Sequence, residues 1–192
     1  MFGLCWLRKM ENRKACTLDG LPRDAHVEDI IGYYAEGGYH PVHIGDRIGI
    51  GERFEVQHKL GYNETGTIWL CLDSKNGRRV GVKILKASKS LESHPEVLAL
   101  RLFDGIDREE LYANHVFPVE EYFWIEGPNG RHLCFIIQVL GPAISYTLEG
   151  IDLDTPDTLA DLCLQAANGL KYLHDRKICH GSKMPPTGSI IC

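Results

Sequence analysis

The sequence predicts an α+β fold in which five antiparallel strands and one helix are followed by a long second helix. Three observations lead to this prediction. Apolar and polar residues alternate over residues 54–60, Asn76-Gly77 separates two apolar runs, and leucine and alanine recur every three or four positions over residues 159–173. These patterns are typical of a half-buried strand, a hairpin turn and one apolar helix face, respectively.

Three strands are predicted to open the sheet, at residues 54–60, 67–72 and 79–85. Short turns join them, so they are expected to form an antiparallel meander. The second turn contains Asn76-Gly77, whose residues tolerate the positive φ angles of a tight hairpin. Residues 1–38, which precede the meander, mix charged, glycine and apolar residues without a sustained period and are predicted to be a mobile leader.

A helix is predicted to start at Ser93-His94-Pro95-Glu96. Ser93 can cap it, Pro95 suits the first turn, and Glu96 stands where a capping box needs a carboxylate. Two more strands are predicted at residues 116–124 and 132–140, and the second is so apolar that a central place in the sheet is expected.

The last predicted element is a long helix that begins at Thr155-Pro156 and carries one apolar stripe from Leu159 to Leu173. Basic residues gather at its C-terminal end, where they complement the helix dipole.

Composition limits the classes of function. The hydrophobic share of 44% supports a packed core, and the net charge of −5 argues against nucleic-acid binding by bulk electrostatics. The seven cysteines form no CxxC pair, which predicts reduced thiols in the cytoplasm or nucleus. No segment has the pattern of a membrane span or a secretory signal, and the histidines lack metal-ligand spacing, so neither a membrane partner nor a metal site is predicted.

Lys83 is the most informative residue. It lies among β-branched residues on a strand that otherwise reads as buried, where a charge is costly unless an anion meets it. The anion could be a carboxylate of the chain or a phosphate of a ligand; alternatively, Lys83 lies on the surface of an edge strand. A turn with Gly61 and Gly66 precedes it and Glu96 follows it, an order that predicts a nucleotide-phosphate clamp. Glu96 could also serve only as a capping residue.

Seven short motifs in this order resemble eukaryotic protein kinases, and most closely the SR-protein-kinase-like serine/threonine kinases of fungi. They are residues 38–46 (Gly-Tyr-His-Pro-Val-His-Ile-Gly-Asp), 58–61 (His-Lys-Leu-Gly), 67–70 (Thr-Ile-Trp-Leu), 132–134 (His-Leu-Cys), 139–142 (Val-Leu-Gly-Pro), 169–174 (Gly-Leu-Lys-Tyr-Leu-His) and 178–181 (Ile-Cys-His-Gly). The resemblance implies a kinase-like small lobe at residues 39–140, a hinge and the first helices of the large lobe at 141–181, and a divergent tail at 182–192.

The resemblance also implies an ATP site. Its residues would be Leu60, Gly61, Asn63, Gly66, Ile68, Gly81, Lys83, Glu96, Ile137, Gln138 and Leu140. The glycines would let backbone approach phosphate, Lys83 would hold the α- and β-phosphates, and Glu96 would pair with Lys83. Gly81 with Val56 or Leu60 would lie near adenine. Ile137 would guard the back of the pocket, and the backbone at Gln138 and Leu140 would meet adenine.

The sequence departs from the kinase pattern at three places. Asn63 replaces a glycine of the loop, where its tolerance of positive φ would limit the cost, and Gly81 replaces an alanine, which is expected to be sterically harmless. Ser182 stands where the family has the aspartate that accepts the substrate proton, and serine is not a base near neutral pH without help. The expected ligands of Mg²⁺, a downstream asparagine and Asp-Phe-Gly, are missing, so no catalytic residue is intact.

Three functional alternatives follow. In the first, the chain is a protein kinase whose sequence is truncated by a reading-frame or splice difference, or by a truncated gene, and which is inactive as given. Arg-Ser-rich proteins are its candidate substrates. Alternatively, it is a non-catalytic kinase-like module that binds nucleotide or a protein partner, or a fragment that does not fold. The apolar stripe of the last helix, left without large-lobe helices, would need a partner or favour aggregation.

Overall fold

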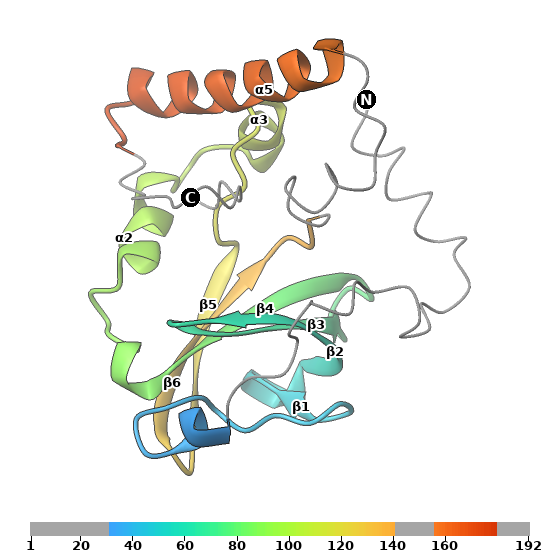
Figure 1. Ribbon diagram of the computed structural model, residues 1–192, viewed down its shortest axis with the longest axis vertical. Coiled ribbons are helices and arrows are strands. Elements are labelled where there is room, and N and C mark those ends of the chain that lie inside the picture. The colour runs from blue at the N-terminus through green and yellow to red at the C-terminus, as the bar shows by residue number, and fades with distance from the viewer. Residues whose placement is uncertain (1–30, 141–155, 180–192) are drawn as a thin grey trace.

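The computed structural model describes residues 31–140 and 156–179. A twisted antiparallel sheet forms one layer, and three α-helices lie on one side of it, with α5 (Pro156–Asp175) farthest from the sheet (Figure 1). The predicted α+β class is confirmed, as is the antiparallel sheet followed by helices.

The sheet has six strands in the order β1-β2-β3-β4-β6-β5, and every neighbouring pair is antiparallel. The strands are β1 (Arg47–Ile48), β2 (Phe54–Asn63), β3 (Gly66–Asp73), β4 (Arg79–Leu85), β5 (Glu121–Gly127) and β6 (Gly130–Ile137). All five predicted strands are present as β2 to β6, and the sheet has one more, β1, which was not predicted because two residues are too few to show alternation.

The predicted meander is present as β2, β3 and β4. At its second turn, Gly77 adopts a φ of 69° and donates its N–H to the Asp73 carbonyl at 2.8 Å. The apolar strand β6 lies between β4 and β5, so its predicted central position is confirmed. It ends at Ile137, three residues earlier than predicted.

Side chains of the sheet alternate between two buried layers. One layer forms the main core with residues of all six strands, among them Phe54, Val56, Cys71, Val82 and Ile136. The other layer joins Leu133 and Phe135 to Val97 of α2 (Pro95–Leu102). Lys83 alternates with Val82 and Ile84 along β4 and therefore points to the α2 side.

Helices α2, α3 (Arg108–Ala113) and α5 share a third core. Phe103, Leu111, Val116, Tyr172 and Leu173 form it. α3 has only six residues and was not predicted. The predicted strand at 116–124 starts later, at Glu121. Val116 packs instead into the core of the three helices, and Val119 packs into the layer between the sheet and α2.

The last residues of the predicted leader are joined to the segment after β4. Residues 31–38 contain the 3-10 helix η2 (Ile31–Tyr34), and Gly37 and Gly38 accept backbone hydrogen bonds from Ser88 and Ala87 at 2.9 and 3.0 Å. Two more 3-10 helices, η3 (Ile50–Glu52) and η4 (Ala87–Lys89), follow β1 and β4. No helix in the described ranges combines the length and apolarity of a membrane span.

Candidate functional site

Lys83 and Glu96 form an ion pair between β4 and α2. Lys83 Nζ lies 2.5 Å from Glu96 Oε1, and the two side chains are 13% and 19% exposed. β4 lies between β3 and β6, so the alternative of a surface lysine on an edge strand is wrong. The carboxylate of Glu96 is the anion that offsets the desolvation of this partly buried cation.

The ammonium of Lys83 keeps donors for a second anion. An ammonium has three N–H groups, and a single hydrogen bond, to Glu96, is formed by Lys83 Nζ within the described residues. The same nitrogen lies over the Phe135 ring, 6.0 Å from the ring centroid. A phosphate oxygen could therefore bind Lys83 without displacing Glu96.

His94, not Ser93, caps α2. The Glu96 N–H donates to His94 Nδ1 at 3.3 Å, so the capping box predicted for Ser93 and Glu96 is absent and the carboxylate turns to Lys83 instead. Desolvation lowers the pKa of His94; the Glu96 charge raises it and the Lys83 charge lowers it. The neutral ring is the form that can accept this hydrogen bond. Sequence reasoning missed His94 because histidine is an uncommon cap.

The predicted phosphate turn is a tight hairpin between β2 and β3. Asn63 pairs with Gly66, leaving Glu64 and Thr65 as the turn. Asn63 Oδ1 accepts hydrogen bonds from the backbone N–H groups of Thr65 and Gly66 at 2.9 and 3.0 Å. The expectation that Asn63 would matter for positive φ was wrong, since its φ is not positive and its side chain organises the turn instead.

The two glycines of this hairpin have different surroundings. A Cβ at Gly66 would come within 2.2 Å of the Ile84 carbonyl oxygen, so only glycine fits there. A Cβ at Gly61 would meet no atom within 4 Å, and Gly61 follows a register shift in β2. Gly61 therefore leaves open space beside the backbone.

Several predicted site residues share the sheet face of Lys83. Gly61 pairs with Ile68 and Ile68 pairs with Lys83, so the three form a row across β2, β3 and β4. Directly opposed residues of antiparallel strands project to the same face.

Gly81 of β4 lies two residues before Lys83, on the same face of the sheet, and pairs with Ile137 of β6. A Cβ at Gly81 would lie 2.7 Å from Ile137 Cγ1, so the glycine fits here without a clash, whereas an alanine would require the Ile137 side chain to shift. The glycine provides the space that the Ile137 side chain fills.

The remaining predicted residues divide into three groups. Val56 is 1% exposed in the main core on the opposite face, which leaves Leu60, 44% exposed, as the candidate near adenine. Gln138 and Leu140 follow β6, where Gln138 Oε1 is buried without a partner among the described residues and Leu140 is 46% exposed. Ser182 lies outside the described residues.

Within residues 31–140 and 156–179, no group of three or more His, Cys, Asp or Glu side chains is placed to hold a metal ion.

Comparison with known proteins gives a consistent set of relatives. The chain is 31% identical to protein kinase dsk1 of Schizosaccharomyces pombe over 87% of this chain and 31% of the relative. It is 30% identical to human SRSF protein kinase 3, over 83% and 28%, and 31% identical to the serine/threonine-protein kinase SRPK of Physarum polycephalum, over 79% and 36%. The chain thus spans about a third of the length of these relatives.

Among solved structures, the crystal structure of a kinase domain matches with a TM-score of 0.57 at 17% identity, over 74% of this chain and 40% of that one. This likeness shows the fold. No family model matches the sequence.

Proposed function

The relatives of this chain are SR-protein kinases and its described part has the kinase fold; from these two premises we propose that residues 39–140 are the nucleotide-binding small lobe of an ATP-dependent serine/threonine protein kinase. Residues 141–181 would form the hinge and the start of the large lobe. The observation that carries this proposal is the partly buried Lys83–Glu96 pair beside the β2–β3 hairpin.

The residues of the proposed site divide into two parts. At one end, Lys83 would bind phosphate oxygens with the donors that Glu96 leaves, and Gly61, Asn63 and Gly66 would bring the hairpin backbone close to them. When bound, ATP supplies the phosphoryl group. At the other end, Ile137 seated against Gly81 would close the pocket behind adenine. Leu60, Ile68, Gln138 and Leu140 would complete the adenine side.

The substrates would be serine or threonine side chains of proteins, and Arg-Ser-rich proteins are the class to test. One relative is named as a kinase of SRSF proteins, which motivates this choice. The four described cysteines are free thiols, and this supports a cytoplasmic or nuclear location.

A second function, nucleotide or protein binding without catalysis, is favoured by Ser182. In the sequence, Ser182 takes the position where the resemblance requires a carboxylate to accept the proton of the substrate. We therefore expect the sequence as given to bind ATP but to transfer no phosphate. Labelled-phosphate transfer to an Arg-Ser-rich peptide distinguishes the two functions.

ATP binding is tested by the shift in melting temperature of the full chain with ATP. At a free ATP concentration of about 100 times Kd, a ligand specific for the native state adds roughly 2.7 kcal/mol to the free energy of unfolding. Lys83→Met should abolish the shift, whereas Lys75→Met, in the exposed turn after β3, should keep it.

The melting curve of each variant without ATP shows first that it folds. A wild-type chain that ATP does not stabilise would refute nucleotide binding. A folded Lys83→Met chain with the full shift would refute the role of Lys83.

A further inference from the structure

A segment that precedes the sheet forms a hydrogen bond with the β2–β3 turn. The Tyr39 hydroxyl donates a 2.6 Å hydrogen bond to the carbonyl of Asn63, 24 residues away, and Tyr39 is 1% exposed. A buried phenol hydroxyl needs such a partner, because an unpaired one would lose its hydration without compensation. The bond therefore fixes the position of Asn63, the residue whose side chain organises the turn.

Tyr39 is itself fixed by its backbone. Its N–H donates to the Tyr33 carbonyl at 2.7 Å, and its carbonyl accepts from Asn129 Nδ2 at 2.6 Å. At Gly38, a Cβ would lie 2.0 Å from the Tyr33 carbonyl oxygen, so only glycine fits where the chain turns back on Tyr33. The Tyr39 backbone is thus bonded to the β5–β6 turn, which belongs to a different part of the sheet.

Lys86 adds a second connection between this segment and the turn. Its ammonium lies 4.4 Å from the Tyr33 ring centroid and 4.7 Å from that of Tyr39, at cation–π distance. Its backbone N–H donates to the Thr65 carbonyl at 2.9 Å. The turn is therefore held at Asn63 by Tyr39, at Thr65 by Lys86, and at Gly66 by close packing on Ile84.

We propose that Tyr39 is a positioning residue that holds the β2–β3 turn in the geometry that binds nucleotide phosphates. This inference rests on the proposed function. A turn that is already ordered loses less conformational entropy when a ligand binds beside it, so phosphates that reach the ordered turn bind more tightly than they would beside a loose turn. The benefit applies to ligands whose phosphates reach the turn, ATP above all, and not to adenosine.

The test is calorimetric titration of the full chain with ATP and with adenosine. Tyr39→Phe removes only the hydroxyl. It should raise the Kd for ATP about five-fold, the factor that corresponds to one ordinary hydrogen bond, and leave the Kd for adenosine unchanged. The matched control is Tyr33→Phe: this ring contacts the same lysine, but it is 42% exposed and its hydroxyl donates no hydrogen bond within the described residues. Both affinities should be unchanged in the control.

A second readout separates this inference from the proposed function. Hydrogen exchange at the Thr65 and Gly66 amides should be faster in Tyr39→Phe than in Tyr33→Phe, with or without nucleotide. An unchanged exchange rate, an unchanged Kd for ATP, or an equal loss of affinity for ATP and adenosine would each overturn the positioning role. If the wild-type chain binds no ATP, the proposed function fails, and the exchange rates alone decide whether Tyr39 holds the turn.

Discussion

Gly61 and Gly66 lie on the same hairpin, yet the structure requires glycine at only one of them. Gly66 packs against the Ile84 carbonyl, where a Cβ would stand at 2.2 Å, whereas nothing lies within 4 Å of a Cβ at Gly61. Neither residue has a positive φ, so the difference arises from space and not from backbone strain.

Alanine at these two positions should therefore act differently. Gly66→Ala should lower the free energy of unfolding by about 2 kcal/mol or more, because backbone must move apart between β3 and β4. Gly61→Ala should change it by less than about 0.5 kcal/mol. If Gly61 lies beside the phosphates as proposed, Gly61→Ala should nevertheless weaken ATP binding. Urea denaturation measures the stabilities, and equal losses would contradict this account of the hairpin.

The imidazoles of the half-buried His40 and the buried His132 pack against each other, with ring centroids 4.9 Å apart. His40 Nδ1 and His132 Nε2 are buried without hydrogen-bond partners among the described residues. Desolvation first, and then the charge of His132, lower the pKa of His40 to about 4, against the opposing effect of Asp46. The pKa of His132 is also lowered by desolvation.

This pair predicts a loss of stability in mild acid. A lowered pKa in the folded state means that the unfolded chain binds the proton more readily, so stability present above pH 6.5 is lost as the pH falls toward 4. Between pH 7 and pH 5, His40 should contribute a loss of about 1 to 2 kcal/mol.

Urea unfolding at both pH values measures this loss. His40→Gln, which does not titrate, should reduce it by that amount. His43→Gln, with a side chain 85% exposed, serves as the control. An identical pH dependence in His40→Gln and the wild type would contradict the prediction.

At the scale of elements, one arginine connects three strands. Arg53, just before β2, binds Asp73 at the end of β3 through Nε and one terminal nitrogen, both at 2.8 Å, and its other terminal nitrogen pairs with Glu121 at the start of β5. The Asp73 side chain is 0% exposed and that of Glu121 is 44% exposed. Arg53 holds the pKa of Asp73 below its usual range.

The two carboxylates should differ in their effect on stability. Asp73→Ala should cost about 3 kcal/mol, because it leaves the mostly buried Arg53 without its bidentate partner and also removes the acceptor for the Lys75 N–H. Glu121→Ala should cost less than about 1 kcal/mol, as expected for an exposed pair. Thermal unfolding of both variants measures this difference, and similar losses would show that burial does not set the strength of these pairs.

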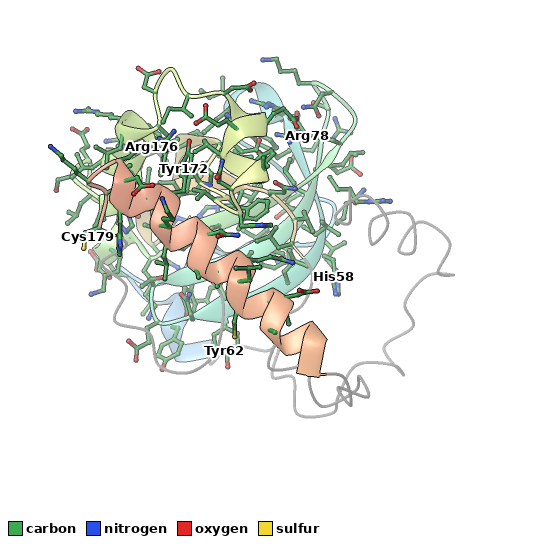
Figure 2. All side chains as sticks on the ribbon, turned by 90° about the horizontal axis from the view of Figure 1, so that it is seen from above. His58, Tyr62, Arg78, Tyr172, Arg176 and Cys179 are labelled. Carbon is green, nitrogen blue, oxygen red and sulfur yellow. The ribbon has the colours of Figure 1, made fainter. Side chains whose placement is uncertain are left out.

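At the scale of the whole molecule, α5 is joined to the rest of the described chain near its C-terminal end. Tyr172 and Arg176, labelled in Figure 2, both reach Glu110 of α3, at 2.7 and 2.6 Å, and Leu173 is 1% exposed beneath them. Farther toward the start of the helix, Leu170 and Cys163 of the stripe are exposed, and so is Leu164 outside the stripe, at 59%. The apolar stripe that the sequence shows is thus buried only in part within the described residues.

Two leucines of α5 therefore provide a matched test. Leu173→Ala should destabilise the chain by about 2 to 4 kcal/mol and release α5 first, since it empties the core shared with α2 and α3. Leu164→Ala should change stability by less than about 0.5 kcal/mol. Hydrogen exchange over residues 156–175 monitors the release of the helix. Protection that persists in Leu173→Ala would show that the bonds of Glu110 to Tyr172 and Arg176 suffice to hold α5 in place.

By itself, the sequence determined the order of the five longer strands, α2 and α5, the meander, the central apolar strand and the nearness of Lys83 to an acidic partner. These features depend on the spacing of apolar residues over a few positions and on the cost of burying a charge, and both can be judged locally. The resemblance to kinases, carried by short motifs in a fixed order, was accordingly confirmed by relatives and by fold.

Only the tertiary structure decided which residues meet across the sheet. It placed Val56 on the face away from Lys83, gave the cap of α2 to His94, seated Ile137 against Gly81 and joined Tyr39 to Asn63. Each of these outcomes depends on strand register, on the path of a connecting segment or on a gap of a few tenths of an ångström between side chains. Such quantities are set by the packing of residues far apart in the chain, and no local pattern encodes them.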